Sequence, residues 1–253
     1  MPSGRWPGKY REGLVLIQVI EYWPALLRGL LITVWVAVAS IMLAALGALV
    51  LGALRLSLKT WVRISTAVLI EFIRGASALV LLFWVFYALP LVPGMPHLGP
   101  LTAAIIVLSL IGASYGAEIV RSGIESISVG QRDACHALGL SRRDGFVQVI
   151  LPQALTQIVP AFGSLAADMV KWTSIVSFVG VQDVLYAANS VRTATYATVP
   201  VFCLLAALYW GLCVLSGMIF RAVEKQLPLT RARRAAAPGT VATDALASSQ
   251  GRG

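Results

Sequence analysis

The sequence is poor in charged residues. Only 12% of its 253 residues are Asp, Glu, Lys or Arg, whereas 58% are hydrophobic. Soluble domains carry roughly 25% charged residues, so this composition excludes a soluble globular protein and indicates an integral membrane protein. The net charge of +9 does not indicate a nucleic-acid partner. The basic residues flank apolar runs, as membrane topology requires, instead of clustering on a soluble face.

Residue types that carry chemistry are also scarce. The cysteines, Cys135, Cys203 and Cys213, form no Cys-x-x-Cys pair and have no metal-ligand spacing. His97 and His136 have no Glu-x-x-His partner, which argues against a membrane-embedded enzyme. No Gly-x4-Gly-Lys-Ser/Thr loop occurs, so the chain is not itself an ATPase. We therefore expect neither a catalytic residue nor a metal or cofactor bound by this chain.

Long apolar runs predict an all-α integral membrane fold with about five transmembrane helices. A spanning helix needs about 20 mostly apolar residues. Runs of this kind cover five ranges: 25–54, 64–89, 101–121, 153–178 and 198–220. We expect three regions along the chain: an interfacial segment over 1–24, a transmembrane domain over 25–227 and a disordered tail over 228–253.

The distribution of Lys and Arg predicts the orientation of the helices. These residues concentrate in 55–63, 121–143 and 221–234 but are almost absent from 90–100 and 180–197. Cytoplasmic loops carry the excess of basic residues. We therefore expect the N-terminus outside and the C-terminus in the cytoplasm, although the basic residues near the N-terminus partly oppose this.

The charged segment 122–152 has the pattern of a short helix, a glycine turn and a second helix. Two Ser-x-x-Gln/Asp capping boxes predict where the helices begin: Ser128 with Gln131, and Ser141 with Asp144. Gly139 stands where a helix C-cap glycine is expected. Pro152 is expected to disrupt or end the second helix.

This segment is similar to the EAA loop of ABC importer permeases, the cytoplasmic loop that contacts the ATPase. The family pattern is Glu-Ala-Ala, three residues, Gly, nine residues and Ile-x-Leu-Pro. Here Asp133-Ala134-Cys135 leads through three residues to Gly139, and nine more lead to Val-Ile-Leu-Pro at 149–152. The departures are Asp for Glu, Cys for Ala and Val for Ile. The resemblance implies these ATPase-coupling residues: Asp133, Ala134, Cys135, Ala137, Leu138, Gly139, Leu151 and Pro152.

Four further stretches are similar to permeases of polar amino acid (His/Glu/Gln/Arg/opine) ABC importers: 29–33, 71–75, 117–127 and 171–177. The resemblance covers residues 25–227. It implies a multi-pass protein of the bacterial cytoplasmic (inner) membrane, surrounded by lipid, with a type I importer permease fold. It also implies a second permease subunit, identical or paralogous, two copies of an ATPase subunit that binds ATP and Mg, and an extracytoplasmic substrate-binding protein.

Charged residues inside the apolar runs are candidates for function, because each costs about 2.5–3.5 kcal/mol on insertion scales. Arg74 is followed by Gly75 and Ser77, where a loosened helix can open backbone groups to a cavity. Its guanidinium can hold a substrate carboxylate through two parallel hydrogen bonds. For the other charged residues, intramembrane ion pairs or snorkelling to an interface are the alternatives: Glu71, Glu118, Asp168 and Lys171.

Trp172 stands where members of this family commonly carry a small polar or acidic residue. An indole offers a flat π face for stacking or cation–π contact, which favours a compact zwitterion, such as an ectoine-like solute, over arginine or lysine. The alternative is that Trp172 anchors the helix at the membrane interface. The expected substrate-binding residues are Arg74, Gly75, Ser77, Trp172, Thr173 and Ser174.

The sequence therefore predicts the permease subunit of a binding-protein-dependent ABC importer for an amino acid or a similar small zwitterion. A separate ATPase subunit would power it. The alternative is a stand-alone secondary transporter or channel. The small size of the chain and the absence of two hydropathy-matched halves argue against that alternative.

Overall fold

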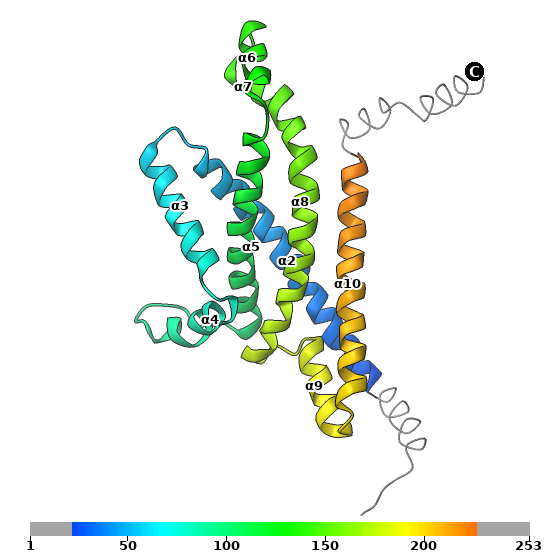
Figure 1. Cartoon of the computed structure of the whole chain (residues 1–253). Helices are drawn as coiled ribbons and strands as arrows, with labels where there is room; N and C mark the ends of the chain where they lie inside the picture. Colours follow the sequence, from blue (N-terminus) through cyan, green and yellow to red (C-terminus); the bar gives the residue numbers. More distant parts are fainter. Residues whose placement is uncertain (1–21, 227–253) are drawn as a thin grey trace, which may run out of the picture. The chain divides into compact units, whose positions relative to one another are not determined.

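The computed structural model describes residues 22–226, and every regular element in this range is helical (Figure 1). The α-helices are α2 (Trp23–Arg55), α3 (Thr60–Gly75), α4 (Ala78–Phe83), α5 (Pro100–Glu125), α6 (Val129–Ala137), α7 (Arg142–Gly145), α8 (Leu151–Trp172), α9 (Val184–Thr195) and α10 (Thr198–Gln226). Two segments are π-helical, Trp84–Ala88 and Phe146–Ile150, and two are 3₁₀-helical, Leu89–Leu91 and Thr173–Val179. The expected tail over 228–253 and nearly all of the expected segment 1–24 lie outside the described residues.

Four helical stretches are long and apolar enough to cross a membrane: α2, α5, the run Arg142–Val179 and α10. A fifth span is present if the pair Thr60–Gly75 and Ala78–Leu91 counts as one. That pair is bent by 100°, so the apolar run expected over 64–89 is broken after Gly75, and α3 turns sharply into α4 (Figure 1). The prediction of about five membrane helices is confirmed.

The described chain forms two compact units. The first comprises residues 22–121 and 164–217, and the second comprises residues 122–163 and 218–226. The first unit holds most of α2 to α5, the end of α8, α9 and the greater part of α10. The second unit holds the segment 122–152 that resembles the EAA loop.

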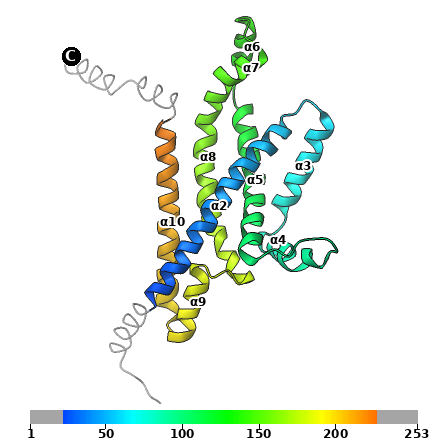
Figure 2. The same cartoon turned by 180° about the vertical axis from the view of Figure 1, so that it is seen from behind.

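Within the first unit, α2 runs obliquely across α5 (Figure 2). Small residues form the contact between the two helices. A Cβ added to Gly47 would lie 2.8 Å from the Cβ of Ala113, and one added to Gly52 would lie 2.8 Å from Val120 Cγ1. Lipid is as apolar as a helix surface, so close packing of small residues, rather than exclusion of water, holds membrane helices together. The glycines on α2 therefore set the distance between these two helices.

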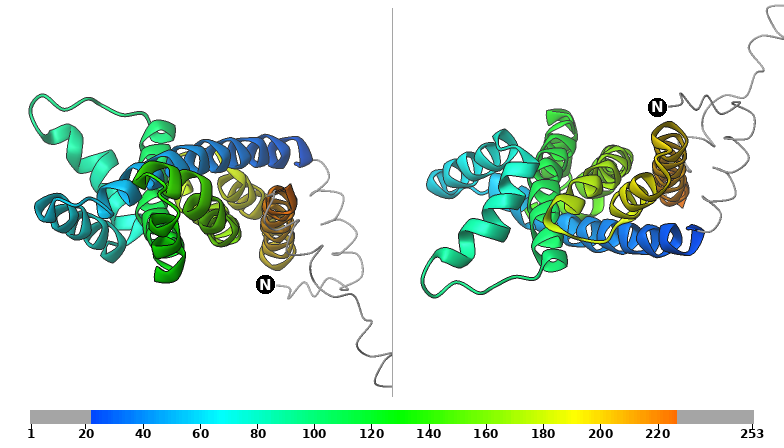
Figure 3. Two further views of the ribbon diagram at one scale, coloured as in Figure 1. Left: turned by 90° about the horizontal axis from the view of Figure 1, so that it is seen from above. Right: turned by 90° about the horizontal axis from the view of Figure 1, so that it is seen from below.

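Two clusters of buried apolar residues order the first unit. One joins α2, α3, α4, α5 and the 3₁₀ segment Thr173–Val179 through residues that include Val36, Ile73, Leu82, Leu108 and Val176. The other joins α2, α9 and α10 through Leu26, Val184, Ala187, Ala188, Val191, Val201 and Leu205. Figure 3 (right) shows α9 between α10 and the beginning of α2. The sequence did not predict α9, whose range falls in the segment 180–197 that was expected to be a connector.

Candidate functional site

The break between α3 and α4 places Arg74 at a helix end. Ala76 (φ −79°, ψ 142°) and Ser77 (φ −66°, ψ 130°) are extended, so α3 ends at Gly75. The N–H of Ala76 still donates to the carbonyl of Phe72, at 3.2 Å. The expectation that the helix loosens after Arg74 is confirmed, and Gly75 and Ser77 are both exposed at the break.

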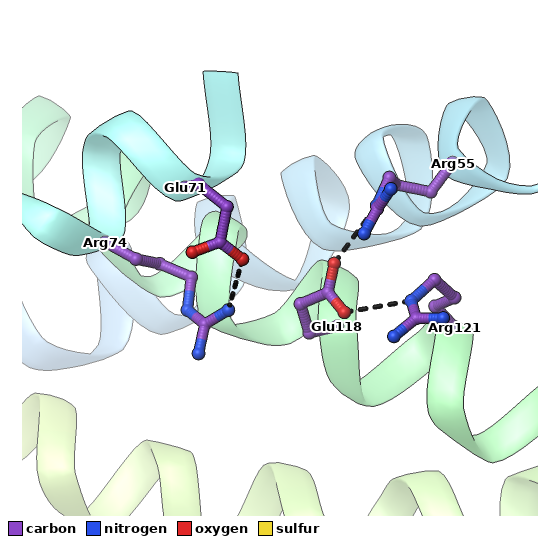
Figure 4. Close-up of polar contacts among 5 residues, drawn as sticks. All are labelled: Arg55, Glu71, Arg74, Glu118 and Arg121. Carbon is purple, nitrogen blue, oxygen red and sulfur yellow. Dashed lines mark hydrogen bonds and ion pairs between the residues drawn. The ribbon is translucent and has the colours of Figure 1, made fainter. Parts of the chain in front are cut away.

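The Arg74 guanidinium has two neighbours. Its Nη1 lies 3.1 Å from Oε1 of Glu71, one turn earlier on α3 (Figure 4). Its Cζ lies 5.0 Å from the centroid of the Tyr115 ring on α5, within the range of a cation–π interaction. The Arg74 Nε is buried and has no hydrogen-bond partner among the described residues. The Glu71 side chain is 65% exposed, and this single contact is the ion pair that Arg74 makes among the described residues.

Tyr115 connects Arg74 to Trp172. The rings of Tyr115 and Trp172 have centroids 5.6 Å apart and planes tilted by 46°. Both rings are partly buried and pack against the first apolar cluster. The structure thus places two residues expected to bind substrate, Arg74 and Trp172, next to one aromatic ring, Tyr115, which the sequence did not predict as part of the site. The sequence did contain a signal for this role, because Tyr115 is a large aromatic residue among the small residues of 112–117.

The hydroxyl groups after Trp172 bond to their own helix. Thr173 is fully buried, and its Oγ1 donates to the carbonyl of Val170 at 2.7 Å. Ser174 Oγ donates to the carbonyl of Lys171 at 2.9 Å. These bonds accompany the change from α8 to the 3₁₀ segment, and they leave Thr173 without the exposed surface that a substrate ligand needs. In this structure Thr173 is buried and bonded to its own helix, and its role in substrate binding stays a prediction.

The other charged residues that the sequence marks as candidates are found in ion pairs. Lys171 Nζ lies 2.9 Å from Oδ1 of Asp168, and more than half of each side chain is exposed. Glu118 is shared between two arginines: its Oε1 lies 3.1 Å from Arg55 Nε, and its Oε2 lies 2.9 Å from Arg121 Nε (Figure 4). Only 19% of the Glu118 side chain is exposed, so this carboxylate ties the end of α2 to α5.

A buried carboxylate, Asp183, was not predicted. It caps α9 by accepting a hydrogen bond from the N–H of Tyr186 at 2.9 Å, and it also accepts one from the Ser177 hydroxyl. The Tyr209 hydroxyl on α10 lies 3.5 Å from its other oxygen. Burial raises the pKa of Asp183 above its ordinary value, and the hydrogen bonds from Ser177 and Tyr186 partly offset that rise. An Asp directly before the apolar pair Val184–Leu185 was the capping signal in the sequence.

The beginning of α2 packs against the backbone of Asp183 and Val184. Thr33 Oγ1 donates to the carbonyl of Gly29 at 3.0 Å and accepts from the N–H of Val184 at 3.0 Å. A Cβ added to Gly29 would lie only 2.7 Å from the carbonyl oxygen of Asp183. This contact gives the stretch 29–33, which resembles the amino acid permeases, a physical role: it seats α2 on the start of α9.

In the second unit, α6 ends in a glycine turn. Gly139 has a φ of +71°, its N–H donates to the carbonyl of His136 at 3.0 Å, and the N–H of Leu140 donates to that of Cys135 at 3.1 Å. These two bonds define a Schellman motif, and the prediction for Gly139 is confirmed. Ser128 does stand at the N-cap of α6, but its side chain makes no capping bond to the described chain, so the first capping box is wrong.

The second helix of this segment begins as expected but does not end at Pro152. Ser141 accepts a hydrogen bond from the N–H of Asp144 at 3.2 Å, and its hydroxyl also bonds the Asp144 carboxylate. The chain then passes through the π-helical turn Phe146–Ile150 into α8, which begins at Leu151. Pro152 therefore stands inside the continuous helical run Arg142–Val179, directly after the π-helical turn. Leu151 and Pro152 are half-buried.

The expected coupling residues do not all face the same way. Five of them are exposed: Asp133, Ala134, Ala137, Leu138 and Gly139. The exposed fraction of Leu138 is 78%. Cys135 is only 7% exposed; a Cβ added to Gly145 of α7 would lie 3.1 Å from the Cys135 Cβ. Cys135 therefore packs α6 on α7, and it does not belong to the surface that a partner could touch.

Comparison with known proteins identifies the family. Residues 40–227 match the model of the binding-protein-dependent transport system inner membrane component. The chain belongs to this family. It is 33% identical over 218 residues to the probable amino-acid ABC transporter permease protein y4tF of Sinorhizobium fredii, covering 85% of this chain and 92% of that one. It is 30% identical to the glutamine transport system permease protein GlnP of Escherichia coli, covering 82% and 96% of the two chains.

Solved structures agree. A crystal structure of an amino acid ABC transporter with histidines superposes with a TM-score of 0.77 at 26% identity, covering 83% of this chain and 98% of that chain. The inward-facing MetNI methionine ABC transporter has a TM-score of 0.64 at 22% identity and shares the fold. The protein is thus an inner-membrane permease component of an ABC importer. Its family implies ATPase and substrate-binding partners, and the stand-alone transporter is not favoured.

Proposed function

We propose that this permease carries an amino acid or a similar small zwitterion across the inner membrane. Relatives named for amino acids, glutamine, octopine and L-cystine support this class of substrate. ATP bound with Mg to two copies of a separate ATPase subunit supplies the energy. The permease pairs with a second permease subunit, identical or paralogous, with its N-terminus outside and its C-terminus in the cytoplasm.

The row formed by Arg74, Tyr115 and Trp172 is the observation that supports this proposal. A substrate carboxylate that takes two parallel hydrogen bonds from the Arg74 guanidinium competes well with Glu71, which holds it through one contact of 3.1 Å. The Tyr115 face keeps the guanidinium in place. The indole of Trp172 offers a π face to the substrate's ammonium group. Trp172 stands where an acidic residue would suit a cationic side chain, so an uncharged or compact amino acid fits best.

The exposed face of α6 is the proposed docking surface for the ATPase. Ala134 and Ala137 allow close approach, and Leu138 offers apolar area to a partner. Gly139 turns the chain so that this face stays uncovered. Nucleotide binding favours the conformation in which the ATPase holds α6 most tightly, and this differential affinity shifts the permease between its states.

Uptake by proteoliposomes that contain the complete complex tests the substrate site. Replacing Arg74 by Lys removes the paired donors but keeps the charge, and we expect the substrate concentration for half-maximal uptake to rise about tenfold or more. Arg63→Lys, an exposed position on the same helix, is the matched control and should transport normally. Unchanged uptake by the Arg74→Lys complex would remove Arg74 from the site.

A panel of amino acids and compatible solutes, including ectoine, identifies the substrate. The readout is stimulation of ATP hydrolysis in membranes that contain the permease, its ATPase and its substrate-binding protein. We expect one liganded binding protein to stimulate hydrolysis. An ATPase that fails to associate with the folded permease would contradict the proposal.

A further inference from the structure

One cationic side chain attaches α6 to the end of α5. Nη2 of Arg132, in the first half of α6, donates to the carbonyl oxygen of Ile124 at 3.0 Å. Ile124 lies in the last turn of α5, where carbonyl groups have no partner within the helix. The Arg132 side chain is half-buried, and its Nε is buried without a hydrogen-bond partner among the described residues. Its position is therefore fixed by this end of α5.

The neighbouring carbonyls of α5 are satisfied locally. The carbonyl of Ser122 accepts from the N–H of Ser126 at 2.9 Å, and the carbonyl of Gly123 accepts from its hydroxyl at 2.8 Å. Within the described residues, the carbonyl of Ile124 accepts a long backbone bond, from the N–H of Ile127 at 3.4 Å. Arg132 supplies its short bond, and the cation lies at the negative end of the α5 dipole.

A second tether from α6 is weaker. Nε2 of Gln153, near the start of α8, lies 3.4 Å from Oε1 of Gln131. This bond joins two neutral, exposed amides at the long end of the hydrogen-bond range, whereas the bond from Arg132 is short and charge-assisted. Of the two adjacent residues that tether α6, Arg132 therefore makes the stronger connection.

We infer that Arg132 is the positioning residue through which movement of α6 is transmitted to α5. The inference rests on the proposed function, in which the ATPase docks on the exposed face of α6. Ala134, Ala137 and Leu138 lie on the exposed surface, while Arg132 reaches the α5 end. An α6 helix without this tether can follow the ATPase while α5 stays behind, so ATP is hydrolysed without moving substrate.

The test is the number of substrate molecules moved per ATP hydrolysed, measured with the complete complex in proteoliposomes. For Arg132→Met we expect normal assembly and hydrolysis, but transport per ATP lowered about tenfold, the effect of losing one charge-assisted hydrogen bond. Arg132→Lys keeps the charge and one donor and should recover part of the loss. Arg143→Met, an exposed arginine of the same segment, is the matched control. Unchanged transport per ATP in Arg132→Met overturns the inference.

Hydrogen exchange of the full-length chain in nanodiscs tests the tether without the ATPase. We expect the amides of residues 129–137 to exchange about tenfold faster in Arg132→Met, because α6 opens more often when one such bond is lost, and to be unchanged in Arg143→Met. Exchange that is identical in all three chains overturns the tether. Failure of the wild-type chain to bind any ATPase would instead overturn the proposed function, and the exchange result would still stand.

Discussion

The guanidinium of Arg74 lies 5.0 Å from the centre of the Tyr115 ring, so a basic residue on α3 and an aromatic residue on α5 meet at the bend between α3 and α4. Both residues lie in apolar runs. The charge of Arg74 is costly there and therefore indicates a function. The Tyr115 ring also contacts the Trp172 ring, with the two centroids 5.6 Å apart. This relationship makes Tyr115 the link between the two ends of the proposed substrate site.

Replacing Tyr115 by Ala should weaken substrate uptake. A cation–π contact contributes about 0.5–2 kcal/mol, depending on how far it is desolvated. We therefore expect the substrate concentration for half-maximal uptake to rise about two- to thirtyfold, with little change in Tyr115→Phe, which keeps the ring. Uptake assays with proteoliposomes measure both. Equal losses in the two variants would show that the hydroxyl, and not the π face, is what matters.

Replacing Gly29 by Ala should destabilise the protein. The added Cβ would lie 2.7 Å from the carbonyl oxygen of Asp183 and 2.9 Å from its carbon. Both are backbone atoms that cannot rotate away, and overpacking of this kind costs about 1–3 kcal/mol. Thermal unfolding in detergent should show a lower midpoint. Gly211→Ala is the control, because no described atom outside its own helix backbone and its chain neighbours lies within 4 Å of its Cβ position; equal midpoints for both variants would contradict the contact.

Replacing Gly139 by Ala should impair coupling. At a φ of +71° an L-residue pays roughly 1–2 kcal/mol, so the turn after α6 is strained or rearranged. We expect reduced transport per ATP, while Gly130→Ala should behave like the wild type, because no described atom outside its own helix backbone and its chain neighbours lies within 4 Å of its Cβ position. The same proteoliposome assay distinguishes them. Normal coupling in Gly139→Ala would mean that the Schellman turn is not needed.

The buried carboxylate of Asp183 should make stability depend on pH. Burial raises its pKa in the folded protein above the ordinary value of 3.8, so the folded state holds the proton more tightly than the unfolded chain. The free energy of unfolding therefore falls as pH rises from 3.8 through the raised pKa, and this contribution is fully present only below 3.8.

Asp183→Asn is uncharged at every pH and keeps an oxygen that can accept from the Tyr186 N–H. Relative to the wild type, it should gain stability as pH rises through that window. Thermal unfolding from pH 3.5 upward, at steps of about half a unit, measures the difference. A constant difference between the two proteins across this range would show that the carboxylate does not titrate there.

Local signals predicted much of this molecule. The apolar runs located the membrane helices, and the residues after Arg74 indicated where α3 ends. The conformation that Gly139 needs follows from the position of a glycine after a helix, and the structure confirms it. These features depend on residues that are close in the sequence, which is why a single sequence was enough to predict them.

The features that were missed depend on contacts between distant positions. The bond between Thr33 and the N–H of Val184 joins residues 151 positions apart, and no local pattern encodes it. Tyr115 gains its role only from the approach of α3 and α8. Pro152 was expected to disrupt or end a helix, but the π-helical turn before it lets the helix continue, an adjustment that local proline rules do not foresee.

The most direct test of the central claim is uptake of a labelled amino acid by proteoliposomes that hold the permease, its ATPase and its substrate-binding protein. The account predicts accumulation that requires ATP and the liganded binding protein and that falls in Arg74→Lys. Accumulation by the permease alone, driven by an ion gradient and unaffected by ATP, would contradict it.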